Sequence, residues 1–230
     1  MTNPIIVALD VESAAEARAL VARIGSLIGF YKVGMELYAA AGMDIARELH
    51  DLGKEVFLDL KMYDIPETVK RAVAQVARTP VRFLTVHAVP SVMRAAAAGR
   101  MESGLQLLGV TVLTSLDQSD IAELGHACTV SELVAERTRQ AVACGVDGLV
   151  CSPLEVAAAR RIAGPKTILV TPGVRSPGSD KGDQRRVATP AEAVSNGADY
   201  LVMGRQIARS ADPAGAVERV LEEIAAVRSA

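Results

Sequence analysis

The sequence predicts a single (β/α)8 barrel, in which eight parallel strands are each followed by a helix. Three observations support this. Eight short apolar runs rich in β-branched residues recur along the 230 residues, stretches with helical spacing separate them, and no Pro/Gly/Ser linker interrupts the series. The runs are nearly continuous in hydrophobicity, as in parallel strands that are covered on both faces. We therefore expect one domain over residues 1–230.

Each expected strand is followed by enough chain for a helix. In order, the strands are residues 5–10, 30–34, 54–61, 83–88, 107–115, 148–152, 167–173 and 200–204. Between them lie Ala-, Glu- and Arg-rich segments such as SAAEARALVARIG (13–25) and PAEAVSNGA (190–198). A doubly wound open sheet is the alternative. It fits less well, because no GxGxxG follows the first run and polar residues end many different runs, whose ends would converge only in a barrel.

Composition and charge argue against several functional classes. Hydrophobic residues make up 50% of the chain and charged residues 23%, which is typical of a compact soluble protein. A net charge of -2 gives no electrostatic basis for binding nucleic acid or an anionic membrane. No apolar run approaches the ~20 residues that span a bilayer, and the N-terminus lacks the basic region of a signal peptide. We expect a cytoplasmic protein.

The cysteines and histidines show no metal-site pattern. Cys128, Cys144 and Cys151 lack CxxC spacing and cannot all pair, so we interpret them as small buried residues of a reduced compartment. No His, Cys or carboxylate cluster has transition-metal spacing. His50 and His126 are expected at ordinary surface positions. The chain also has neither a nucleophile elbow nor a Walker loop.

Charged residues interrupt the third expected strand, in the stretch VFLDLKMYDIPETV. Side chains alternate faces along a strand, so Asp59 and Lys61 share one face while Leu58 and Leu60 take the other. The leucines are expected to meet the helix layer, which directs Asp59 and Lys61 into the barrel mouth. Asp64 falls beyond the strand, in the loop that leads to the next helix.

Asp10 and Lys32 bring further charge to the same end of the predicted barrel. Asp10 ends the first run and Lys32 lies within the second. A structural ion-pair network between strands is the alternative, and it would be preferred for a lone buried pair. Burying several charges is costly and hard to justify by stability alone, so we favour a functional site.

Two segments near the C-terminus predict a phosphate site. The segment LVTPGVRSPGSDKGDQRRV, residues 169–187, leads from a strand into a loop of the length typical of lids and binding loops. Met203, Gly204 and Arg205 follow the eighth run. The loops after strands seven and eight form the common phosphate site of such barrels. A solvated position at a helix start is the alternative for Arg205.

Three polar residues at strand ends have open interpretations. His87 ends the fourth run, where a satisfied mouth-lining histidine is a more common outcome than a proton-transfer role. Thr114 and Ser115 end the fifth run and suit either a ligand contact or a cap of the next helix.

Taken in order, these motifs resemble a known family. They are ALD, YKVG, DLKMYDIPET, TVHA, VTVLTS, TPGVR, GDQRR and MGR. The sequence resembles orotidine 5'-phosphate decarboxylase of the bacterial type along essentially its whole length, and the DxKxxDIPxT block is the most specific motif. The resemblance implies decarboxylation of orotidine 5'-phosphate to uridine 5'-phosphate (UMP) and CO2, the last step of de novo pyrimidine nucleotide synthesis. It implies no metal and no organic cofactor.

The resemblance also implies a role for individual residues. Lys61 would be the general acid of a charged tetrad, and Asp64 would come from the partner subunit of a homodimer. Thr114 would meet the pyrimidine edge, and Gln184 would bridge the phosphate and the base. The implied tetrad is Lys32, Asp59, Lys61 and Asp64. The implied substrate-binding set is Asp10, Lys32, Asp59, Leu60, Lys61, Met62, Tyr63, Asp64, Ile65, Pro66, Glu67, Thr68, Thr114, Arg175, Gln184, Gly204 and Arg205.

Two other functions stay open on the sequence. One is a metal-dependent keto-sugar-phosphate decarboxylase, which shares an Asp-x-Lys-x-x-Asp core and would be distinguished by its metal requirement. The other is a non-catalytic barrel that binds a nucleotide monophosphate as a sensor, which turnover of orotidine 5'-phosphate would exclude.

Overall fold

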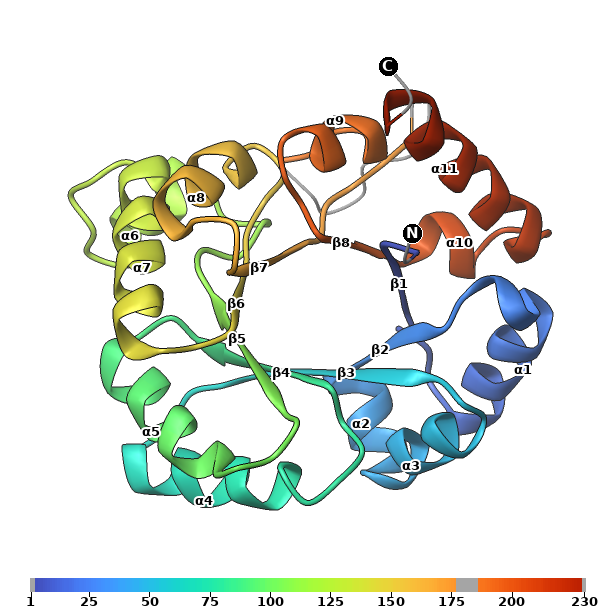
Figure 1. Cartoon of the computed structure of the whole chain (residues 1–230), viewed down its shortest axis with the longest axis horizontal. Helices are drawn as coiled ribbons and strands as arrows, with labels where there is room; N and C mark the ends of the chain where they lie inside the picture. Colours follow the sequence, from blue (N-terminus) through green and yellow to red (C-terminus); the bar gives the residue numbers. More distant parts are fainter. Residues whose placement is uncertain (1–2, 177–185, 229–230) are drawn as a thin grey trace.

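The computed structural model describes residues 3–176 and 186–228. Within them, eight parallel strands form a closed barrel in sequence order, and helices surround it (Figure 1). This confirms the predicted (β/α)8 barrel. The strands are β1 (Ile5–Ala8), β2 (Phe30–Gly34), β3 (Glu55–Met62), β4 (Phe83–His87), β5 (Gln106–Val110), β6 (Gly148–Val150), β7 (Ile168–Thr171) and β8 (Tyr200–Met203).

The helices alternate with the strands, with additional helices after β1, β2, β5 and β8. Their ends follow local signals in the sequence: Ser13 caps α1, and Thr129 and Thr189 form capping boxes at α7 and α9. They are α1 (Ala14–Ile24), the 3-10 helix η1 (Gly25–Leu27), α2 (Met35–Ala41), α3 (Asp44–Asp51), α4 (Pro66–Val76), α5 (Pro90–Arg100), α6 (Gln118–Glu123), α7 (Val130–Cys144), α8 (Val156–Ala163), α9 (Pro190–Ser195), α10 (Arg205–Ala208) and α11 (Pro213–Arg228).

Six of the expected strands end earlier than hydrophobicity predicts, and two of these differences concern site residues. β1 stops at Ala8, so Asp10 lies just past the strand, and β5 stops at Val110. The β5 ladder has its last backbone bond at Thr111, which donates to the carbonyl of Val150 at 3.1 Å. Thr114 therefore belongs to the following loop and does not end a strand. An apolar run in the sequence indicates that its residues are buried. Here the buried residues continue past the point where backbone pairing between the strands ends.

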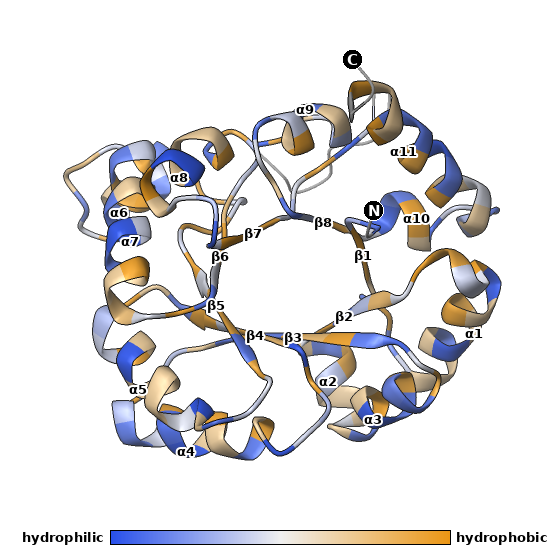
Figure 2. Ribbon diagram, in the orientation of Figure 1, coloured by the Kyte–Doolittle hydropathy of each residue, from blue (hydrophilic) through white to orange (hydrophobic). Residues whose placement is uncertain are grey.

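The barrel has two apolar layers. Alternate strand residues pack together in its interior, where the Phe30 and Phe83 rings lie 5.0 Å apart and those of Phe57 and Phe83 lie 5.9 Å apart. The other strand face packs against the helices, in a larger cluster that includes Leu58 at 0% exposure. In Figure 2 the strands are largely hydrophobic, while the helices carry both hydrophobic and hydrophilic bands. Because apolar side chains fill the interior, a ligand can reach polar residues only at the ends of the barrel.

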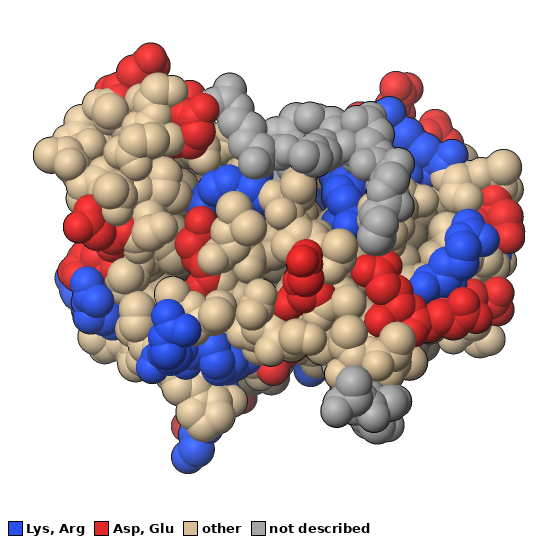
Figure 3. Space-filling model, turned by 90° about the horizontal axis from the view of Figure 1, so that it is seen from above, with Lys and Arg blue, Asp and Glu red and all other residues tan. Residues whose placement is uncertain are grey.

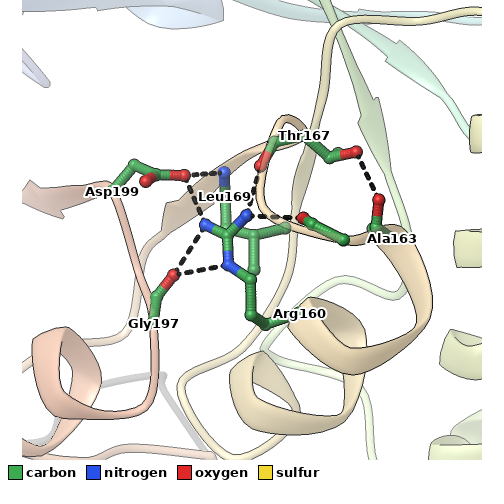
Figure 4. Close-up of polar contacts among 7 residues, drawn as sticks. Arg160, Ala163, Thr167, Leu169, Gly197 and Asp199 are labelled. Carbon is green, nitrogen blue, oxygen red and sulfur yellow. Dashed lines mark hydrogen bonds and ion pairs between the residues drawn. The ribbon is translucent and has the colours of Figure 1, made fainter.

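An arginine network fastens the amino ends of β7 and β8 (Figure 4). Arg160 of α8 donates to the carbonyls of Gly164, Thr167 and Gly197 and to Asp199 Oδ2, at 2.6 to 3.2 Å. Asp199 Oδ2 also accepts from the backbone N–H of Leu169 at 2.7 Å. We call this set the floor network, because it lies at the end of the barrel opposite the carboxyl ends of the strands.

The described residues include no membrane-spanning helix, and the face drawn in Figure 3 carries charges of both signs. No helix among residues 3–176 and 186–228 is long and apolar enough to cross a bilayer. On the face shown in Figure 3, acidic and basic side chains are interspersed, in keeping with the net charge of -2.

Candidate active site

Strand β3 brings Asp59 and Lys61 together, as the alternation of side chains predicts. Lys61 Nζ donates to Asp59 Oδ2 at 2.9 Å, while Leu58 and Leu60 pack in the layer between strands and helices. The β3–β4 register shifts between Leu58 and Met62, and Lys61 has a φ of 49°. A lysine in the left-handed region is uncommon and costs backbone strain of the kind found at functional sites.

Thr85 of β4 holds this irregular segment in place. Its Oγ1 accepts from the backbone N–H of Lys61 at 2.9 Å and donates to Asp59 Oδ1 at 2.9 Å. Thr85 is 0% exposed. Sequence reasoning missed it, although a lone hydroxyl in the middle of the apolar run FLTVH was the available signal.

Four charged side chains form one chain of ion pairs, which we call the mouth cluster: Asp10, Lys32, Asp59 and Lys61. Lys32 Nζ lies 2.8 Å from Asp10 Oδ1 and 3.6 Å from Asp59 Oδ2. The side chains of Lys32 and Asp59 are only 9% and 12% exposed, whereas that of Asp10 is 55% exposed. The cluster thus runs from the solvent into the barrel along β1, β2 and β3.

The pKa of Asp59 is lowered despite its burial. Burial alone would raise the pKa of this carboxyl, but the ammonium groups of Lys32 and Lys61 and hydrogen bonds from Lys61 and Thr85 outweigh that effect. Asp59 is therefore ionised at neutral pH. Its negative charge lies 2.9 Å from Lys61 Nζ and 3.6 Å from Lys32 Nζ.

The run FYKVG ends at Gly34, where the neighbouring ion pair leaves no room for a side chain. A Cβ at this position would lie 2.9 Å from Lys32 Nζ and 3.0 Å from Asp10 Oδ1. A larger residue would displace the Lys32–Asp10 pair, so the glycine gives this pair its space.

A cavity of about 500 Å³ opens at the mouth and brings most of the predicted residues together. The mouth cluster lines one part, and residues from the loops after β5, β7 and β8 line another. The predicted site residues that line it are Asp10, Lys32, Asp59, Lys61, Thr114, Arg175, Gly204 and Arg205. Ser115, for which a ligand contact was one of two interpretations, also lines it, as does Arg209, which was not predicted.

The predicted phosphate residues follow neighbouring strands. Arg175 is held by a backbone bond from its N–H to the carbonyl of Ala188 at 3.0 Å. The Gln206 amide contacts Ser176 twice: it donates to Ser176 Oγ at 2.7 Å and accepts from the Ser176 N–H at 3.1 Å. This contact fixes the residue after Arg175 to the residue after Arg205. Gln184 lies outside the described residues.

The segment after β3 points away from this cavity. Leu60 and Met62 pack against the outer core. Asp64 Oδ1 accepts the N–H of Ile65 at 2.6 Å, and Tyr63 and Ile65 are 67% and 70% exposed. None of the described residues from 62 to 68 lines the cavity of its own chain. In a single chain, therefore, the structure does not bring Met62, Tyr63, Asp64, Ile65, Pro66, Glu67 or Thr68 to the predicted site, nor Leu60.

His87 lies at the rim, half-buried, with its ring 5.6 Å from that of Tyr63. Burial, then the charges of Arg137 and Lys61, lower its pKa, so the imidazole is neutral at pH 7. His87 is not among the residues that line the cavity, so both interpretations of it stay predictions.

The fold and this charged cavity define a barrel enzyme of the class whose active site lies at the carboxyl ends of the strands. The sequence profile of the orotidine 5'-phosphate decarboxylase / HUMPS family matches residues 3–220. The chain belongs to this family.

Individual relatives agree with that assignment. The chain is 52% identical over 221 residues to orotidine 5'-phosphate decarboxylase of Bradyrhizobium sp. (strain ORS 278), covering 96% of this chain and 91% of the relative. It is 50% identical to the protein of that name from Rhodopseudomonas palustris (strain HaA2), covering 96% and 94%. The crystal structure of orotidine 5'-phosphate decarboxylase from Lactobacillus acidophilus superposes with a TM-score of 0.85 at 34% identity, covering 97% of this chain and 99% of that one.

Proposed function

We propose that this protein decarboxylates orotidine 5'-phosphate to UMP and CO2, with Lys61 as the general acid. One observation carries the proposal: Lys61 lines the cavity with its ammonium held by an ionised Asp59, while Arg175 and Arg205 line the same cavity from other strands. A cation beside the reacting carbon and arginines for a phosphate are the two demands of this reaction.

The chemistry requires a positive charge at the carbon that loses CO2. Breaking this bond leaves electron density on a ring carbon with little delocalisation. The Lys61 ammonium stabilises that negative charge and then donates its proton to the carbon. Asp59 holds the Lys61 ammonium in place through an ion pair, and Thr85 fixes the backbone of Lys61. Because the ammonium supplies both the charge and the proton, the proposed reaction draws on no metal and no organic cofactor.

Phosphate binding supplies energy far from the bond that breaks. Arg175 and Arg205 are proposed to hold the phosphate, with backbone approach at Gly204, and Asp10 and Lys32 to contact the ribose. We assign Gln184 to the phosphate and base from the family resemblance alone. Interactions with a remote group can be spent on ordering the reacting centre, which raises the rate of the chemical step.

We further propose a homodimer in which Asp64 and Thr68 serve the partner's site. Asp64 does not reach the cavity of its own chain, and its neighbours Tyr63 and Ile65 are large hydrophobic side chains at 67% and 70% exposure. Such side chains are typical of a surface covered by another subunit. We propose the cytoplasm as the location, and no nucleic acid or membrane partner.

A single spectroscopic assay tests the proposed function. Orotidine 5'-phosphate is added to the purified protein, and loss of its ultraviolet absorbance is followed with product identified by chromatography. We expect multiple turnovers, unchanged after exhaustive chelation. Binding without turnover would instead favour the sensor, and activity that chelation removes and Mg²⁺ restores would favour the sugar-phosphate enzyme.

A further inference from the structure

A second buried ion pair joins the loops around the mouth without lining the cavity. Arg186, between β7 and α9, donates from Nη1 to Oε1 of Glu155 at 2.7 Å, and the two side chains are 10% and 8% exposed. Glu155 is the N-terminal flanking residue of α8, after β6. The pair therefore connects the segments that follow two neighbouring strands.

The same guanidinium reaches a third loop, the one that carries Thr114. Arg186 Nη2 donates to the carbonyls of Val112 at 3.2 Å and Leu113 at 2.9 Å. These residues directly precede Thr114, which is 8% exposed and lines the cavity. β5 has already ended at Val110, so side-chain contacts of this kind set the position of the loop.

Stability alone does not account for this pair. Removing two charges from water is costly, and well-packed apolar residues are often at least as stable as a buried ion pair. Among the described residues, Glu155 Oε2 and Arg186 Nε are also buried without a hydrogen-bond partner, so the pair is only partly satisfied there. A partly satisfied polar network is less favourable than an apolar core. What the pair does provide is a fixed donor for the backbone before Thr114.

We propose that Arg186, oriented by Glu155, is a positioning residue for catalysis: it holds the loop after β5 so that Thr114 meets the pyrimidine edge of the substrate. This inference rests on the proposed function. It differs from a purely structural role because the effect on the reaction passes through Thr114.

A double-mutant cycle between Arg186 and Thr114 tests this coupling. Arg186→Lys keeps the charge and can still pair with Glu155, but an ammonium lacks the planar fork that serves a carboxylate and two carbonyls together. We expect kcat/KM for orotidine 5'-phosphate to fall about 10-fold in Arg186→Lys, mostly in kcat. In the Thr114→Val background the same change should cost less than about 3-fold, because the hydroxyl to be positioned is absent.

Two controls separate positioning from folding. Arg186→Lys combined with Arg205→Ala should show additive losses, since Arg205 is proposed to hold the phosphate and not the pyrimidine edge. Arg160→Met, which removes a comparable arginine from the floor network, should lower the thermal midpoint and leave kcat/KM unchanged. Additive losses of Arg186→Lys and Thr114→Val, or parental kcat/KM in Arg186→Lys, would overturn the role of Arg186.

The Arg186→Met–Glu155→Leu double variant covers the case in which single changes impair folding. Replacing both ions by apolar groups is expected to restore the thermal midpoint lost in Arg186→Met, whereas kcat/KM stays at least about 10-fold below the parent. Recovery of kcat/KM together with stability would show a structural role only. A parent protein that does not turn over orotidine 5'-phosphate would overturn the proposed function as well, whereas an active parent with uncoupled variants would overturn this inference alone.

Discussion

The mouth cluster and the floor network both pair basic side chains with aspartates at opposite ends of one barrel, yet they differ in where their hydrogen bonds go. In the floor network, Arg160 makes five hydrogen bonds, all within the chain, to three carbonyls and to Asp199 (Figure 4). In the mouth cluster, the Lys61 ammonium makes one hydrogen bond within the described residues, to Asp59, and faces a cavity.

This difference separates polar groups that fasten a fold from polar groups that meet a ligand. A guanidinium with five donors can satisfy itself on nearby carbonyls, which is how Arg160 ties β7 to β8. An ammonium with remaining donors and an ionised neighbour is prepared for a further partner. Asp147 repeats the floor arrangement before β6: it pairs with Arg100 and accepts from the N–H of Leu107 at 2.8 Å. Such pairs recur around the floor, which supports their structural role.

Replacing Lys61 gives the largest expected effect on activity. Lys61→Ala removes the charge at the reacting carbon and the proton donor, and we expect kcat to fall by about 10⁴-fold or more while the protein stays folded. Single-turnover kinetics and circular dichroism measure the two quantities. Near-parental kcat in a folded variant would place Lys61 with the structural ion pairs.

Mixing two inactive variants tests whether the mouth is shared between subunits. Lys61→Ala and Asp64→Ala homodimers should each be close to inactive. A heterodimer holds one site that lacks both residues and one intact site. Random exchange makes about half of the dimers mixed, so activity should recover to roughly a quarter of the parental value. No recovery despite exchange verified with mass-tagged subunits would assign Asp64 to its own chain.

Arg205 should show an intermediate effect that depends on the substrate's phosphate. Arg205→Ala is expected to lose several kcal/mol in kcat/KM while folding normally, because a charge-assisted phosphate contact supports the chemical step. With orotidine, which lacks the phosphate, the difference in kcat/KM between variant and parent should therefore be far smaller. Equal losses of kcat/KM with both substrates would show that Arg205 does not contact the phosphate.

Arg160→Met in the floor network should lower stability and leave activity unchanged, the opposite of the changes at the mouth. We expect the free energy of unfolding to fall by about 2 kcal/mol, since carbonyls and a carboxylate lose a charged donor. At temperatures below the unfolding transition, the variant should keep the kcat/KM of the parent. Denaturant titration and steady-state kinetics at one temperature check both, and a kcat/KM loss without destabilisation would contradict the assignment.

The smallest expected effect concerns acid stability at the mouth. Because the pKa of Asp59 is lowered in the folded protein, its ionised form contributes stability at neutral pH. This contribution is lost as pH falls from about 4, the ordinary value for Asp, through the lower folded value. The stability difference between parent and Asp59→Asn, measured by denaturation at pH 7 and pH 3, should therefore shrink in acid. A constant difference would show that Asp59 binds its proton equally in both states.

The sequence by itself determined the barrel and most of the cavity. Eight apolar runs with intervening helical segments predicted the topology, and side-chain alternation predicted that Asp59 and Lys61 share a face opposite Leu58 and Leu60. Both follow from local periodicity, which the chain carries in every short window. Polar residues at the carboxyl ends of different strands were predicted to meet at one end of the barrel. That prediction requires only the topology in addition.

The tertiary structure alone decided where pairing stops and which polar residues support others. Thr85 in the run FLTVH takes its meaning from Asp59 and Lys61 on the neighbouring strand, and Gly34 from the Lys32–Asp10 pair beside it. Arg186 ends the motif GDQRR, but the motif does not show that this residue is buried against Glu155 and the carbonyls before Thr114. The contacts of Thr85 and Arg186 join residues 24 to 74 positions apart. Local periodicity cannot specify such pairs, because their energies depend on the distance and burial that closure of the barrel creates.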